Sequence, residues 1–137
     1  MTRRLLAVLA YMLPTFPLGY FWHLTFFADY YEKLEIYRDE LLIPLGFLAM
    51  LIQAIVWALI YENMFAGLPV SKGALRFFSL AFPLSFSFQV LAVGAKHRMS
   101  SVADYALIET AFIAIHFAVV SPLIAWVYRK PLRTIQT

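Results

Sequence analysis

Long apolar runs alternate with short polar stretches along this chain, and four of the runs are long enough to cross a lipid bilayer. The clearest run extends from Tyr105 to Tyr128 and is followed at once by Arg129 and Lys130. As a helix rising about 1.5 Å per residue it would be roughly 36 Å long, enough to cross the hydrocarbon core with some tilt. The pattern predicts four membrane-spanning helices, at residues 5–27, 41–61, 77–95 and 105–128.

The first run has to be distinguished from a signal peptide, because it begins just after Arg3 and Arg4. No small-x-small cleavage site follows and the apolar run continues to Phe27, so we interpret it as a retained span. Pro14 and Pro17 remove backbone donors from its middle, which predicts a kink or a broken turn there. A small or polar side chain recurs at every fourth position, a stripe suited to facing other helices: Tyr11, Thr15, Gly19 and His23.

Residues 28–40, ADYYEKLEIYRDE, form the most charged stretch of the chain. Helical spacing relates four positions within and just after it, Tyr30, Leu34, Tyr37 and Leu41. This spacing predicts a short amphipathic helix lying in the membrane interface. Such a helix can act as a lid or as a docking face, but tyrosine is enriched at membrane interfaces and we favour an aromatic-anchored connector. The remaining connections are predicted to be a loop at residues 63–76 and a polar turn at residues 96–103.

Short connections between consecutive spans indicate an all-α membrane protein, an up-down-up-down bundle of four transmembrane helices with the short interfacial helix after the first. We expect a single membrane domain over residues 1–137, without the internal repeat that inverted-repeat transporters show. The distribution of basic residues sets the orientation. Arg3, Arg4, Lys72, Arg76, Arg129, Lys130 and Arg133 fall on one side, and Lys33, Arg38, Lys96 and Arg98 fall on the other. This excess places both termini in the cytoplasm.

Composition supports the membrane interpretation. The 137 residues are 63% hydrophobic and 14% charged, and their mean hydropathy is +0.76. A soluble domain of this length has too large a surface-to-volume ratio to bury so much apolar surface, so the natural solvent is lipid. The net charge of +3 and the pI near 9.3 do not indicate a nucleic-acid partner, because the basic residues lie at helix ends. Cysteine is absent, which excludes disulfides and cysteine-based metal sites.

The candidate chemistry lies in a polar cluster within the spans. Counting residues inward from the helix ends places His23, Gln89 and Glu109 at one level in the outer half of the membrane, and Gln53 and His116 near its middle. One face of the last span carries Tyr105, Glu109, Phe112 and His116. We therefore predict a polar cavity that opens outward, with His23, Gln89 and Glu109 at its mouth and Gln53 and His116 at its floor.

Two interpretations of this cluster remain open. Ionisable groups at membrane depth are costly, which makes Glu109 and His23 candidates for binding or relaying a proton, or for holding a cationic ligand. Alternatively the polar groups hydrogen-bond one another and lock the bundle, which we favour for the uncharged side chains of Gln53, Ser85, Ser87 and Gln89. No HExxH, ExxH or HxxxH pair, nucleotide fingerprint or GxSxG motif occurs, so we predict no metal and no cofactor.

The plan of spans and aromatic residues resembles the small bacterial inner-membrane proteins of about four spans that are grouped as domains of unknown function. The resemblance is carried by GYFWHLTFFADYYEKLEIYRDE and IPLGFLAMLIQ in the first half and by LIETAFIAIHFAVVSPLIAWVYR in the last span. It implies a location in the bacterial inner membrane and transfers no functional residue.

Three hypotheses about function follow. The leading one is an inner-membrane protein with a structural or binding role, as an accessory subunit of a larger membrane complex or as a homo-oligomer, with the lipid bilayer as its environment. The second is a small transporter or proton-coupled permeation unit that uses Glu109, His23 and His116. The weakest is a membrane enzyme acting on a lipid or other apolar substrate, with Glu109 and His23 as acid and base.

Overall fold

Helical segments follow one another along residues 2–129, the part of the chain that this computed structural model describes. The α-helices are α1 (Thr2–Phe21), α2 (Ala28–Leu34), α3 (Ile43–Met64), α4 (Val70–Ser85), α5 (Ala92–Gly94) and α6 (Val102–Val127), and two π-helical turns are η1 (Trp22–Phe26) and η2 (Phe86–Leu91). The basic residues Lys130 and Arg133, which were used to predict the orientation, lie outside the described residues.

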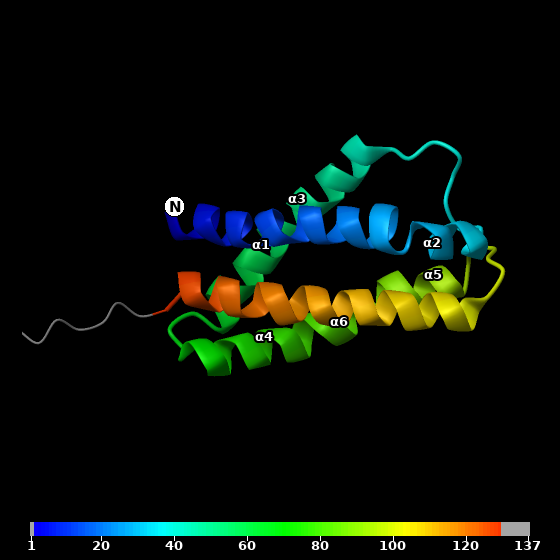
Figure 1. The fold of residues 1–137 in the computed structure, drawn as a ribbon. Coiled ribbons are helices and arrows are strands. Elements are labelled where there is room, and N and C mark those ends of the chain that lie inside the picture. The colour runs from blue at the N-terminus through cyan, green and yellow to red at the C-terminus, as the bar shows by residue number, and fades with distance from the viewer. Residues whose placement is uncertain (1, 130–137) are drawn as a thin grey trace, which may run out of the picture.

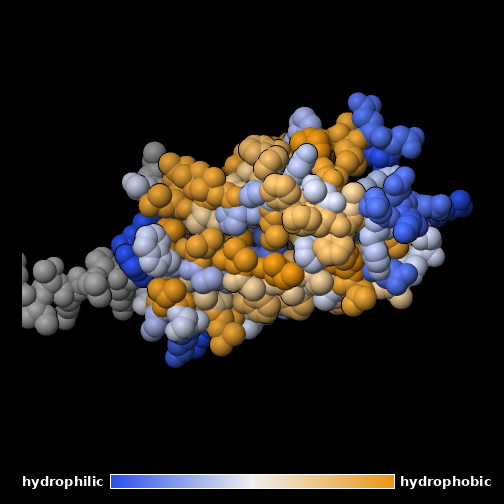
Figure 2. Space-filling model, in the orientation of Figure 1, coloured by the Kyte–Doolittle hydropathy of each residue, from blue (hydrophilic) through white to orange (hydrophobic). Residues whose placement is uncertain are grey.

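Four of the resulting rods are long and apolar enough to span a membrane: Thr2–Phe26, Ile43–Met64, Val70–Gly94 and Val102–Val127. They run in alternating directions, and α2 lies beside the end of the first rod (Figure 1). Orange, hydrophobic atoms cover the middle of the visible face, whereas blue, hydrophilic atoms gather at its two ends (Figure 2). These observations confirm the predicted fold, a bundle of four transmembrane helices with a short helix after the first, and identify an integral membrane protein.

Helix α6 forms the centre of the bundle and lies between α1 and α4 (Figure 1). Within the most apolar 18-residue stretch of α6, 44% of the residues are buried, whereas the corresponding value for α3, which lies at the periphery, is 17%. The core between α3, α4 and α6 is aromatic: Phe77 is fully buried and packs edge-on against Trp57, Tyr61 and Phe117. Since lipid tails are as apolar as the core, close packing of this kind is the main force that holds such helices together.

Two predicted boundaries need correction: the start of the third span and the end of the interfacial helix. The third span begins at Val70, not at residue 77, because Pro69 caps the helix and the predicted loop is helical from there on. Lys72 and Arg76 are exposed in its first turns, where long basic side chains can extend to the water interface. The interfacial helix ends at Leu34, and Glu35 takes a left-handed conformation with φ of 57°, so the amphipathic helix is shorter than the pattern suggested.

Helix α1 is continuous through Pro14 and Pro17, so the broken turn predicted there is absent. The irregularity comes later, as the π-turn η1. A second π-turn, η2, follows Pro83 in the third rod. Turns of this type widen a helix locally and are frequent at functional sites. Here η1 contains His23 and η2 contains Gln89, two residues of the predicted polar cluster.

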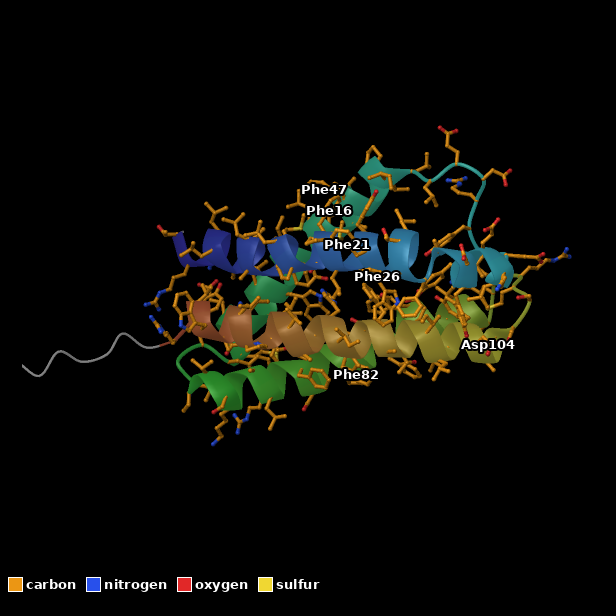
Figure 3. All side chains as sticks on the ribbon, in the orientation of Figure 1. Phe16, Phe21, Phe26, Phe47, Phe82 and Asp104 are labelled. Atoms are coloured by element: carbon orange, nitrogen blue, oxygen red, sulfur yellow. The ribbon has the colours of Figure 1, made fainter. Side chains whose placement is uncertain are left out.

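Helix α3 crosses α1 obliquely, and its first turns stand away from the centre of the bundle (Figure 1). Near its other end the Tyr61 side chain reaches α4, where its hydroxyl occupies the space that a Cβ on Gly73 would fill. Every residue from Ile43 to Ala49 is exposed, in contrast. Phe16 of α1 and Phe47 of α3 meet edge-on across this divergence, with ring centroids 6.1 Å apart (Figure 3).

Candidate functional site

The outer cluster joins the end of the first rod to α6 and α2 through Glu109. The Nε2 atom of His23 lies 3.1 Å from Oε1 of Glu109, and the Tyr31 hydroxyl donates to the same oxygen at 2.9 Å. The other ring nitrogen of His23, Nδ1, lies 3.0 Å from the backbone oxygen of Gly19. Glu109 is only 8% exposed, so its carboxyl group depends on these partners rather than on water.

The hydrogen-bond roles in the outer cluster can be assigned by counting protons. A carbonyl oxygen only accepts, so Nδ1 of His23 must carry a proton that it donates to Gly19. One further proton then lies between Nε2 of His23 and Oε1 of Glu109. On the nitrogen it makes an imidazolium–carboxylate pair, and on the oxygen it makes a neutral pair. The site has no net charge in either arrangement, which lowers the cost of placing it in a membrane.

The inner cluster joins α1, α3 and α6 near the middle of the bundle. The Tyr11 hydroxyl donates to Oε1 of Gln53 at 2.8 Å. The Thr15 hydroxyl donates to the backbone oxygen of Tyr11 at 2.5 Å, and its oxygen lies 2.8 Å from Nε2 of His116. Because the only hydroxyl proton of Thr15 goes to Tyr11, Nε2 of His116 must donate to Thr15.

This assignment leaves hydrogen-bonding capacity unused. With its proton on Nε2, a neutral His116 presents a lone pair at Nδ1, for which the described residues offer no partner. The amide nitrogen of Gln53 and the side-chain amide of Gln89 likewise form no hydrogen bond with the described residues. The two clusters are separated by Phe112, whose ring packs against His23 at 4.5 Å and against His116 at 5.9 Å between centroids.

A cavity of about 280 Å³, here called the polar cavity, brings most of these side chains together. Its wall includes the whole stripe predicted on the first span, Tyr11, Thr15, Gly19 and His23, together with Gln53, Gln89, Phe112 and His116. Glu109 is not on the wall, which corrects its predicted place at the mouth: it lies behind His23 and is held there by Tyr31. Tyr105 also points elsewhere, since its hydroxyl donates to the backbone oxygen of Gln89 at 2.7 Å.

A second hollow of about 260 Å³, here called the apolar groove, adjoins the polar cavity and shares Gly19, His23, Gly46 and Met50 with it. Its other walls are Phe16, Tyr20, Leu24, Tyr37, Leu41, Leu42, Ile43 and Phe47, most of which are exposed on the outside of the bundle. A Cβ built on Gly19 or on Gly46 would meet nothing within 4 Å, so the junction of the two hollows is open. The polar cavity is thus connected sideways to the lipid-facing surface between α1 and α3.

The sequence pattern missed one member of the site and misjudged two others. Tyr31 is fully buried and bonds Glu109, yet it lies outside the apolar positions of the predicted interfacial helix. Ser85 and Ser87 do not join neighbouring helices: Ser87 donates to Leu84 of its own helix, and buried Ser85 has no partner among the described residues. The functional roles predicted for His23, Gln53, Gln89, Tyr105, Glu109 and His116 remain predictions.

The described residues contain no group of three or more histidine or acidic side chains that is placed to bind a metal ion. Compared with family models, with curated proteins and with solved structures, the chain matches none.

Proposed function

We propose that this membrane protein binds a small uncharged amphiphile, with the polar part of the ligand in the polar cavity and its apolar part in the apolar groove. One observation supports this most: the amide nitrogen of Gln53 and Nδ1 of His116 lack protein partners on the wall of a cavity that is open at Gly46. An unpaired polar group in a membrane is costly, so these two atoms have hydrogen-bonding capacity that a ligand in the cavity can satisfy.

The charges around the polar cavity favour a ligand without net charge. Glu109 is not on the cavity wall, and its pair with His23 is neutral as a unit. The wall offers a donor at Gln53 and an acceptor at His116, which suits a head group that both accepts and donates, such as a hydroxyl or an amide. The exposed aromatic and aliphatic walls of the apolar groove suit a hydrocarbon or ring system that enters from the lipid.

The proposal includes a location in the bacterial inner membrane with both termini in the cytoplasm. Its support is the distribution of basic residues, since Arg3, Arg4, Lys72, Arg76 and Arg129 lie at one end of the bundle. This end is called the basic end below. A role as an accessory subunit or as a homo-oligomer is compatible with the same binding site.

A proton-coupled transporter is the second candidate, favoured by the proton shared between His23 and Glu109. Against it, the apolar ring of Phe112 packs against both imidazoles, so the hydrogen-bonded chain from Glu109 does not continue to His116. A membrane enzyme with Glu109 and His23 as acid and base is less favoured, because Glu109 is not accessible from the polar cavity.

The binding proposal is tested by substitutions at Gly46, where a side chain enters open space. Protein purified in mild detergent is extracted with organic solvent, and copurifying neutral amphiphiles are quantified by mass spectrometry. Gly46→Leu, which fills the junction, and Gln53→Leu, which removes the donor, are expected to lose a compound that the wild type and Gly46→Ala retain. Equal amounts in the wild type and Gly46→Leu would rule out binding at this site.

Glu109→Gln separates the candidate functions, because the amide keeps the shape of the carboxyl group. Ligand retention with no pH-dependent proton flux in liposomes is the result expected for a binding protein. A flux that occurs in the wild type and disappears in a folded Glu109→Gln variant would favour the transporter. A variant that retains no ligand and only unfolds more easily would favour a purely structural role.

A further inference from the structure

A groove separate from the polar cavity lies between α1 and α6 at the basic end of the bundle. Its volume is about 530 Å³. Apolar side chains form most of its wall, namely Leu6, Leu9, Ala10 and Leu13 of α1 and Leu123, Trp126 and Val127 of α6. Leu6, Leu13, Leu123 and Trp126 are between 42% and 69% exposed, so this wall faces the surroundings of the bundle rather than its core.

Two arginines complete the groove at its polar end. Arg3 lies in the first turn of α1, and Arg129 follows the last turn of α6, so both stand where the rods leave the membrane. The guanidinium of Arg129 lies 4.3 Å above the Trp126 ring, which orients it at the groove. Neither arginine forms an ion pair with an acidic side chain of residues 2–129, whereas the neighbouring Arg4 is paired with Glu62 of α3.

We propose that this groove binds an anionic phospholipid, with its phosphate between Arg3 and Arg129 and an acyl chain along the leucines. The charge pattern fits one positive head-group site above a long apolar wall at the depth where phospholipid head groups lie. A free phosphate ion would gain nothing from contact with the apolar wall, whereas an acyl chain would. A second copy of the chain, docked through the same face, would bring the unpaired arginines of the two copies together, and their like charges would repel each other.

The test measures lipid binding to the full-length protein in detergent by native mass spectrometry. Phosphatidylglycerol and phosphatidylcholine with identical acyl chains are compared as probes. The wild type is expected to prefer phosphatidylglycerol, and Arg3→Gln and Arg129→Gln are each expected to reduce that preference about fivefold. Arg76→Gln is the matched control, because it removes one exposed charge at the same end of the bundle but outside the groove.

Two further measurements test whether the lipid occupies the groove itself. Leu6→Trp places a larger side chain in the groove and is expected to weaken the binding of phosphatidylglycerol, although both arginines remain. An excess of inorganic phosphate is expected not to displace the lipid. Equal binding of the two lipids by the wild type, an equal loss in Arg76→Gln and Arg3→Gln, or complete displacement by inorganic phosphate would each overturn the proposal. The exposed arginines can be replaced without disturbing the core, so the comparison does not depend on the Leu6 variant.

Discussion

The imidazole of His23 reaches across from the first rod to the carboxyl group of Glu109, with Nε2 and Oε1 separated by 3.1 Å. The residues are 86 positions apart in the chain, and each is half-buried or buried. Since Nδ1 of His23 donates to Gly19, the contact between the two side chains needs one shared proton. Each residue is therefore tolerated at this depth largely because of the other.

This dependence predicts a measurable coupling. His23→Leu leaves a carboxyl group with only Tyr31 as donor, and Glu109→Leu leaves Nε2 of His23 without its partner, so each single variant should be less stable than the wild type. The double variant should lose less than the sum, with a coupling free energy of about 1–3 kcal/mol in a double-mutant cycle. Reversible unfolding in mixed detergent and SDS micelles gives the free energies. Additive losses would show that the contact has no energetic role.

The two glycines Gly46 and Gly73 are expected to respond in opposite ways to alanine. At Gly46 the new methyl group meets nothing within 4 Å, so Gly46→Ala should raise the free energy of unfolding by about 0.5–1 kcal/mol through the higher helix propensity of alanine. At Gly73 the methyl group would overlap the Tyr61 hydroxyl, so Gly73→Ala should lower it by about 1–3 kcal/mol.

The same unfolding assay in mixed micelles compares the two variants. Gly73→Ala combined with Tyr61→Phe, which removes the overlapping oxygen, should recover part of the loss. If the two single variants change stability by the same amount and sign, the Tyr61 hydroxyl does not pack against Gly73 as the structure shows.

The pKa of the Tyr31 phenol predicts a pH dependence of stability at the α2 end. Burial raises this pKa above its usual 10.0, and the charge of Glu109 raises it further. The folded state therefore keeps the Tyr31 proton at a pH where the unfolded chain releases it. This contribution to stability is fully present below pH 10 and decreases as the pH rises above that value.

Tyr31→Phe should be less stable than the wild type at pH 8, because Glu109 loses a donor. Its stability should fall less steeply between pH 10 and pH 11.5, the range just above the usual pKa. Unfolding midpoints at a series of pH values measure both effects. Parallel pH profiles for Tyr31→Phe and the wild type would argue against the burial of this phenol.

Much of this architecture can be predicted from the sequence, because the apolar runs must be helical in lipid and their lengths match its thickness. The four-residue stripe from Tyr11 to His23 also carries structural information, since it lies on one face of the first rod and its polar side chains bond α3 and α6. Counting depth placed His23 and Glu109 at the same level, and the structure brings them into contact.

Other features, such as the burial of Tyr31 and the place of Glu109, depend on tertiary contacts that a hydropathy pattern does not show. The burial of Tyr31 depends on the left-handed residue Glu35, after which the chain leaves the helix, and on Ser100, which donates from its backbone and hydroxyl to the last carbonyls of α2. Whether a side chain lies on a cavity wall or behind it also depends on its neighbours in space: His23 lines the polar cavity, and Glu109 lies behind it. The apolar groove lies at the first turns of α3, whereas the Tyr61 side chain near the other end of this helix packs against Gly73 of α4.

The last prediction compares two buried hydroxyl groups, those of Ser85 and Thr15, which differ in the number of hydrogen bonds that they form. Ser85 is 1% exposed and forms no hydrogen bond within residues 2–129, so Ser85→Ala loses no interaction and should not lower the free energy of unfolding. Thr15 is 5% exposed and connects two residues. Thr15→Val keeps the volume of the side chain but leaves Nε2–H of His116 without an acceptor.

The expected loss for Thr15→Val is about 1–3 kcal/mol, measured by the same unfolding assay. Thr15→Ser, which retains the hydroxyl, should recover most of it. Replacing His116 by phenylalanine in the Thr15→Val background should also restore stability, because the unpaired donor is then removed and an apolar ring remains between Tyr11 and Phe117. If Thr15→Val and Ser85→Ala change stability equally, the hydrogen bond between Thr15 and His116 does not contribute to the stability of the fold.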